Sequence, residues 1–183
     1  WVNGRTAGRN QGGHVPFYVN VAPYLVAGPN RLTLRVEDRQ DPYQPRGKQS
    51  VSGAPVRIYY YCTTGIWQSV WLEPVPPIRI DHLRIVEACP DGTIALQVNL
   101  HGPFGDWEAE LDVLPDLDSE QVIASARASS RNASIALRTR IEQPQPWSPA
   151  TPHLYKLRVR LMQRGQVLDR IESYTGLRTV ELR

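Results

Sequence analysis

The sequence predicts an all-β protein, and three observations support that class. Apolar and polar residues alternate along most of the chain, for example at Leu32, Leu34 and Val36, and this period of two is typical of strands with one buried face. No stretch of a dozen residues keeps the spacing of an amphipathic helix. The 13 glycines and 16 prolines lie mainly between the alternating runs, where antiparallel sheets need short turns. We therefore expect β-sandwich architecture.

The N-terminal part, residues 1–77, is expected to form four to six strands of an incomplete sandwich. Asn3-Gly4 is a strong signal for a two-residue hairpin, but only Trp1 and Val2 precede it. Two residues are too few for the strand that such a hairpin presupposes. We expect an upstream segment to complete this domain. Without that segment, unpaired edges and an uncovered apolar face favour self-association.

A domain boundary is expected at Pro74-Val75-Pro76-Pro77. Three of these four residues lack the amide hydrogen that a sheet ladder needs. The chain is thereby divided into residues 1–77 and residues 78–183.

Seven strand-like runs follow this boundary, a number and spacing typical of an immunoglobulin-like sandwich. Arg164-Gly165 is expected to close the last hairpin, since glycine accepts the positive φ of a primed turn. The expected strands are Ile78 to Glu87, Thr93 to Leu100, Trp107 to Leu114, Gln121 to Ala128, Ala133 to Ile141, Leu154 to Met162, and Gln166 to Thr175.

Charge and composition argue against two classes of partner. The formal charge of +3 is small and evenly spread, so binding to a nucleic-acid backbone is not expected. No apolar run approaches the roughly 20 residues of a membrane-spanning helix, and we expect no membrane partner.

Two cysteines, Cys62 and Cys89, form neither a disulfide framework nor a metal-ligand motif.

Motifs for catalysis are not found in this sequence. It contains no nucleophile elbow, phosphate-binding loop, dinucleotide fingerprint or paired metal-ligating histidines, so we expect no catalytic residue, cofactor or metal. The acidic pair Glu108 and Glu110 falls on the wet face of a predicted strand, and Asp116 and Asp118 fall in a loop. Solvated surface charge explains both pairs better than the two carboxylates of a glycosidase do.

Two segments are candidates for binding. Asp38–Gln49 is a long polar loop for a β-hairpin connection, although a solvated loop or one packed on a neighbouring domain explains it equally well. Tyr59–Trp71 is rich in aromatic residues, whose faces stack on sugar rings but also fill cores.

The sequence resembles two consecutive domains of glycoside hydrolase family two, the family of β-galactosidases, β-glucuronidases and β-mannosidases. The first part resembles its sugar-binding jelly-roll domain, through VNGRTAGRNQGGHVPFYVNVAPYL, AGPNRLTLRVED, PRGKQ and TTGIWQSVWLEPVPPIRIDHLRI. The second part resembles the following immunoglobulin-like domain, through SPATPHLYKLRVRL and YTGLRTVEL. The resemblance covers essentially the whole chain and implies a partial jelly-roll β-sandwich followed by an immunoglobulin-like β-sandwich.

The resemblance also implies a function. Family members continue into a TIM barrel that carries the catalytic carboxylates, so this chain is expected to be a non-catalytic part of a retaining exo-glycosidase, most simply a β-galactosidase, and inactive alone. Its partners are then a β-glycoside, through the parent enzyme, and the barrel itself. The residues implied at the rim of the active site or in sugar binding are Asp41, Arg46, Lys48, Gln49, Tyr59 and Trp67.

Two other functions fit the same residues. A free-standing carbohydrate-binding module would use the aromatic segment as its platform. An immunoglobulin-like interaction domain without a role in sugar binding would fit the seven-strand pattern, because a fold does not fix function.

Overall fold

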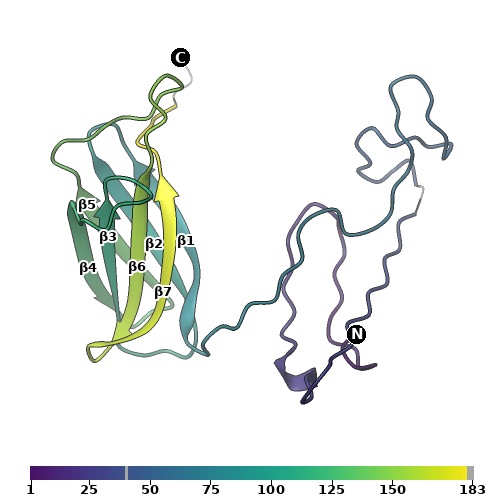
Figure 1. Cartoon of the computed structure of the whole chain (residues 1–183), viewed down its shortest axis with the longest axis horizontal. Helices are drawn as coiled ribbons and strands as arrows, with labels where there is room; N and C mark the ends of the chain where they lie inside the picture. Colours follow the sequence, from purple (N-terminus) through teal and green to yellow (C-terminus); the bar gives the residue numbers. More distant parts are fainter. Residues whose placement is uncertain (40, 181–183) are drawn as a thin grey trace. The chain divides into compact units, whose positions relative to one another are not determined.

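The computed structural model describes residues 1–39 and 41–180. The chain divides into two compact units, Trp1–Leu72 and Glu73–Arg183. All seven strands lie in the second unit (Figure 1). Among the described residues, no helix is both long enough and apolar enough to cross a membrane.

The second unit is a sandwich of two antiparallel sheets that face each other (Figure 1). One sheet has the order β1-β2-β5 and the other the order β4-β3-β6-β7. The strands are β1 Arg79–Ala88, β2 Thr93–His101, β3 Trp107–Leu114, β4 Ala124–Ser130, β5 Ser134–Arg140, β6 Tyr155–Gln163 and β7 Gln166–Thr175.

The core lies between the sheets and contains the apolar residue of each alternating pair. Leu96 on β2 pairs with Leu137 on β5, and both side chains are buried. Leu111 on β3 pairs with Val159 on β6, and neither is exposed to solvent. The strands alternate because one face meets this core and the other meets water.

The turns have the geometry that their residues favour. Arg164 and Gly165 both have positive φ, 49° and 79°, as a type I′ turn between β6 and β7 requires. Gly92, at φ 92°, allows a close approach to the Ile141 carbonyl, which would lie 2.4 Å from a Cβ at that position.

The expected all-β class and the seven strands after the boundary are therefore confirmed. The largest difference is at β4, which begins at Ala124 rather than at Gln121. Residues 115–123 instead form a loop that turns on the Asp116 side chain, which accepts hydrogen bonds from the backbone amides of Asp118 and Ser119.

The first unit differs from its expected secondary structure. The four to six strands expected in residues 1–77 are not found among the described residues, which form isolated bridges such as Val2–Leu32 and a 3₁₀ turn, η1, at Ala22–Tyr24. The alternating residues Leu34 and Val36 are 55% and 45% exposed. A period of two produces a ladder only where a partner strand and a covered apolar face are available, and this segment has neither.

The predicted Asn3-Gly4 turn is present. Asn3 and Gly4 have positive φ values of 51° and 78°, and the backbone groups of Val2 and Arg5 exchange hydrogen bonds across the turn, at 2.9 and 3.0 Å. The Asn3 side chain also donates to Asn30 Oδ1 at 2.8 Å. This turn therefore anchors the start of the chain to a second loop.

Candidate functional site

The Asp38–Gln49 loop is held against the segment that carries the tyrosines. The Tyr60 amide donates to the Lys48 carbonyl at 2.7 Å. The Gln49 side-chain carbonyl accepts a hydrogen bond from the Thr63 amide at 3.0 Å. These bonds fix the C-terminal half of the loop, although no regular ladder is formed.

Arg46 occupies a partly buried position in this arrangement. Its Nη2 donates to the Ser50 carbonyl at 2.6 Å and lies 3.6 Å from Cys62 Sγ. The Cys62 thiol donates to the same carbonyl at 2.8 Å. Nη1 of Arg46 is buried and has no hydrogen-bond acceptor among the described residues. One half of the guanidinium is thus anchored, while the other half has donors to offer.

A small hollow of about 40 Å³ lies beside this guanidinium. It combines a carboxylate, a guanidinium, an amide and a hydroxyl, which are the groups that recognise sugar hydroxyls. It is much smaller than the roughly 300–1000 Å³ of ordinary ligand pockets, so it suits the edge of a ligand rather than a whole one. Its polar lining residues include Asp38, Gln44, Arg46, Gln49 and Thr64.

The structure brings together only part of the predicted loop site. Arg46 and Gln49 both line the hollow, whereas Asp41 and Lys48 do not. Asp41 instead accepts a hydrogen bond from the Tyr43 amide at 2.9 Å and so stabilises a local turn. Lys48 contributes its backbone carbonyl to the loop, and its side chain is exposed.

The two predicted aromatic residues lie outside the hollow. Trp67 is 70% exposed, and its indole Nε1 donates to the Gly13 carbonyl at 2.8 Å. This bond restrains the indole while much of its surface remains accessible. Tyr59 is also exposed, and its amide donates to the Val56 carbonyl at 3.1 Å.

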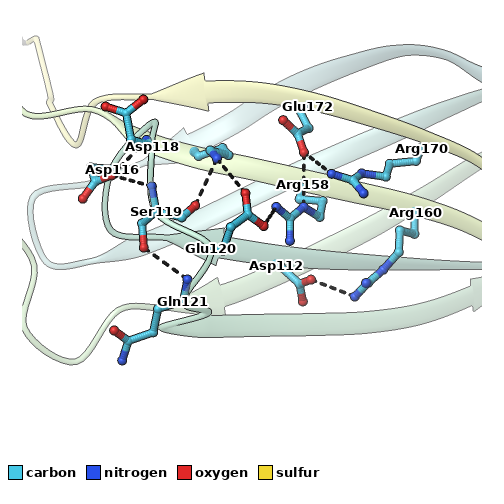
Figure 2. A network of polar contacts seen from close by, with 11 residues as sticks. Asp112, Asp116, Asp118, Ser119, Glu120, Gln121, Arg158, Arg160, Arg170 and Glu172 are labelled. Atoms are coloured by element: carbon cyan, nitrogen blue, oxygen red, sulfur yellow. Dashed lines mark hydrogen bonds and ion pairs between the residues drawn. The ribbon is translucent and has the colours of Figure 1, made fainter.

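A second polar cluster lies on the outer face of the four-stranded sheet in the second unit (Figure 2). Oppositely charged side chains face one another across neighbouring strands, an arrangement that stabilises sheets. Arg160 lies 2.7 Å from Asp112 and 3.2 Å from Glu110, for example. The charged residues are Glu108, Glu110 and Asp112 on β3, Lys156, Arg158 and Arg160 on β6, and Arg170 and Glu172 on β7.

Glu120, from loop 115–123, reaches over this face (Figure 2). Arg158 and Lys156 both donate to its carboxylate. The Arg158 guanidinium, and then the Lys156 ammonium, lower the pKa of Glu120 below its ordinary value. The same contact raises the pKa of Arg158. The two cations are 10% exposed at the side chain, whereas Glu120 is 71% exposed.

Sequence reasoning did not identify this cluster. Its signal was the alternation of Lys156, Arg158 and Arg160 on one predicted strand, because side chains two residues apart share a face. The expectation that Glu108 and Glu110 lie on the wet face is consistent with the structure, where Glu108 pairs with Arg127 on β4. The contact with Glu120 depends on the path of a loop, which alternation does not predict.

A family profile matches the second part of the chain. The profile of "Glycosyl hydrolases family 2" matches residues 78–178. This range covers more than half of the chain and includes all seven strands of the sandwich.

Curated relatives resemble the whole chain. A putative beta-glucuronidase of Formosa agariphila is 27% identical over 191 aligned residues, which include 100% of this chain and 22% of the relative. A beta-galactosidase of Thermoanaerobacter pseudethanolicus is 24% identical, with 100% of this chain and 24% of the relative aligned. The chain thus spans about a quarter of the length of these relatives.

Solved structures show the same fold. A glycosyl hydrolase family 2 member from Bacteroides cellulosilyticus superposes with a TM-score of 0.71 at 18% identity, over 99% of this chain and 24% of that one. A beta-glucuronidase of Bacteroides uniformis gives a TM-score of 0.70 at 20% identity, over 98% of this chain and 23% of that one. The likeness of fold therefore extends over nearly the whole chain.

Proposed function

Because the chain belongs to glycosyl hydrolases family 2, we propose that it is a non-catalytic two-domain part of a glycosidase that cleaves terminal β-glycosides. The proposed domains are residues 1–77, a sugar-binding jelly-roll part, and residues 78–183, an immunoglobulin-like sandwich. Catalysis by a retaining mechanism is assigned to a TIM barrel outside this chain. In this proposal the chain alone hydrolyses nothing, and its two domains pack against the barrel.

The observation that best supports a role at the rim of the active site is the arrangement of Arg46. Its Nη2 is anchored on the Ser50 carbonyl, whereas its buried Nη1 has no acceptor among the residues described. An unpaired buried donor costs free energy, and a ligand oxygen would remove that cost. We propose that Arg46, with Gln49 beside it, donates hydrogen bonds to sugar hydroxyls. We assign weaker roles to the other two residues: Asp41 stabilises the local turn of the loop, and Lys48 adds positive charge to it.

The test is made in the full-length enzyme, because the chain alone is expected to be inactive. Arg46→Ala should lower kcat/KM toward nitrophenyl glycosides by about 10- to 150-fold, since hydrogen bonds from charged donors contribute about 1.5–3 kcal/mol. Arg9→Ala, which removes an exposed arginine of the same unit, is the matched control and should leave kcat/KM unchanged. Unchanged kinetics for Arg46→Ala, with intact folding, would remove Arg46 from the rim.

Among terminal β-glycosides, we propose a β-galactoside as the substrate of the whole protein. The relatives include both a beta-galactosidase and a putative beta-glucuronidase, so a β-glucuronide is the competing substrate. Parallel assays of the full-length enzyme with nitrophenyl β-galactoside and nitrophenyl β-glucuronide separate the two. A larger kcat/KM for the glucuronide would contradict the galactoside assignment.

The exposed indole of Trp67 supports a second function, that of a carbohydrate-binding module. Its ring is restrained by the bond to Gly13, so little side-chain entropy is lost when a sugar stacks on it. Titration of the 183-residue chain with mono- and oligosaccharides tests this function through tryptophan fluorescence. Saturable binding that Trp67→Ala abolishes would favour the module, whereas a lack of binding would favour the supporting role.

A further inference from the structure

Loop 115–123 is held on the sheet largely by charge. Its own hydrogen bonds are local, from Asp118 and Ser119 to the Asp116 carboxylate. Among the described residues, Lys156 and Arg158 donate the side-chain hydrogen bonds that join the sheet to the loop. One backbone bond, from the Ile123 amide to the Val113 carbonyl, joins them where β4 is about to begin. Leu117 and Val122 remain 46% and 45% exposed, so apolar packing of the loop is concentrated at its end, where Ile123 packs against the core.

The two cations converge on one carboxylate. Lys156 Nζ lies 3.4 Å from Glu120 Oε1 and donates to the Ser119 carbonyl at 3.0 Å. Arg158 contacts the other oxygen, Oε2, and its Nε donates to Glu172 at 3.2 Å. The guanidinium fork of an arginine matches the planar geometry of a carboxylate. The Lys156 and Arg158 side chains are nearly buried, whereas the Glu120 side chain is exposed to solvent.

The charge balance around these cations depends on Glu120. Lys156, Arg158 and Arg170 are positive, and Glu120 and Glu172 are negative. If Glu120 leaves, three cations face the single carboxylate of Glu172. A ligand with one negative charge would restore the balance of three cations and two carboxylates that exists with Glu120 in place.

Space is available next to Lys156. An open groove of about 190 Å³ is lined by Leu117, Lys156, Glu172, Ser173 and Tyr174. The exposed Tyr174 side chain and Leu117 of the loop are both among its lining residues. A molecule larger than the carboxyl group itself can therefore occupy the groove.

We propose that Lys156 and Arg158 form a binding site for a small monocarboxylate, and that Glu120 of the chain's own loop occupies this site in the absence of such a ligand. The loop acts as an intramolecular competitor. Removal of the Glu120 carboxylate opens the site to a free organic acid. This proposal concerns the second unit and does not depend on the function proposed for the first.

Chemical rescue of the full 183-residue chain tests the proposal. Glu120→Ala should lower Tm in chloride, and acetate at the same ionic strength should restore it in a saturable manner by about 2–4 °C. The wild-type protein should need a higher acetate concentration for the same response, because the Glu120 carboxylate competes for the site. Adding Lys156→Met to Glu120→Ala should abolish the rescue.

Glu108→Ala is the matched control. Glu108 also pairs with an arginine on the same face, but its partner, Arg127, is 56% exposed at the side chain, whereas Lys156 and Arg158 are each 10% exposed. This variant should respond equally to acetate and chloride. The proposal is wrong if acetate stabilises Glu120→Ala no more than chloride does, or no more than it stabilises Glu108→Ala. Shifts of the arginine Nε–H resonances during the acetate titration give a second, independent readout.

Discussion

The guanidinium carbon of Arg178 lies 5.0 Å from the centre of the Trp147 indole, which places a cation on an aromatic face where the chain leaves β7. The backbone reinforces this contact, because the Trp147 amide donates to the Leu177 carbonyl at 2.9 Å. The Arg178 amide donates to the Ala88 carbonyl at 2.9 Å, at the end of β1. Residues that are far apart in the sequence thus fix the path of the chain after the last strand.

Gly176 lies directly after β7 and packs closely against Trp147. A Cβ at position 176 would lie 3.0 Å from both Cβ and Cδ1 of Trp147, closer than ordinary van der Waals contact. Because its φ lies outside the range that favours glycine, Gly176→Ala acts through crowding alone and should destabilise the second unit by about 1–3 kcal/mol. Urea unfolding measures the effect. Gly13→Ala, where a Cβ meets no atom within 4 Å, should be nearly neutral.

Tyr155 supports the segment that leads to Trp147. Its ring is buried at 2% exposure, and its hydroxyl oxygen accepts a hydrogen bond from the Gln145 amide at 2.7 Å. Tyr155→Phe leaves this amide without its acceptor, so we expect a loss of about 1–3 kcal/mol in the free energy of unfolding. Tyr174→Phe, at an exposed position on β7, is the control. Equal stability of the two variants would show that the Gln145 amide finds water instead.

The sequence predicted the second unit well because its signals are local. Alternation places Leu96 and Leu111 in the core, and Arg164-Gly165 has the residues that a primed turn requires. These signals agree with one another along the whole sandwich. Gly176, which lies in the family stretch YTGLRTVEL, is also explained, since it packs directly against Trp147.

The first unit and the charged face depend on non-local features. The period of two at Leu34 does not reveal whether a partner strand is present, and in this chain it forms no ladder. The pairing of Arg46 with Ser50 and Cys62 requires a folded loop, as does the contact of Glu120 with Lys156. Sequence reasoning can name the residue types in these places, but their distances follow from the path of the loops.

Acidification should weaken the second unit. Hydrogen bonds from Arg170 and Arg158 lower the pKa of Glu172, and those from Arg158 and Lys156 lower the pKa of Glu120. A group whose pKa is lower in the folded state binds protons more readily when unfolded. Its contribution is therefore complete above the ordinary glutamate value of 4.5 and is lost as the pH falls through the lowered pKa.

The measurement is the urea midpoint of the wild type and of Glu120→Gln across this pH range. The wild type should lose stability below pH 4.5, and Glu120→Gln should reduce that loss, because its amide does not titrate. Glu73→Gln serves as the control, since Glu73 is exposed and lies outside the charged face. Identical pH profiles for the wild type and Glu120→Gln would contradict a role for this carboxylate in acid sensitivity.

Self-association through the first unit is the last prediction. Leu32, Leu34 and Val36 form an alternating apolar stripe, and each side chain is at least 45% exposed. Apolar surface contributes about 25 cal/mol per Å² when it is removed from water, and the backbone at Leu34 and Val36, which form no bridge among the described residues, can accept a second strand. The isolated 183-residue chain should therefore form dimers or larger species as its concentration increases.

Size-exclusion chromatography with light scattering measures this association. Leu34→Glu should shift the population toward monomer, because a charge on the stripe opposes its burial. Val167→Glu is the matched control: Val167 is 50% exposed but lies on β7 of the second unit, so this variant should associate as the wild type does. A monomeric wild type at all concentrations would contradict the prediction. Equal effects of the two substitutions would place the contact outside the first unit.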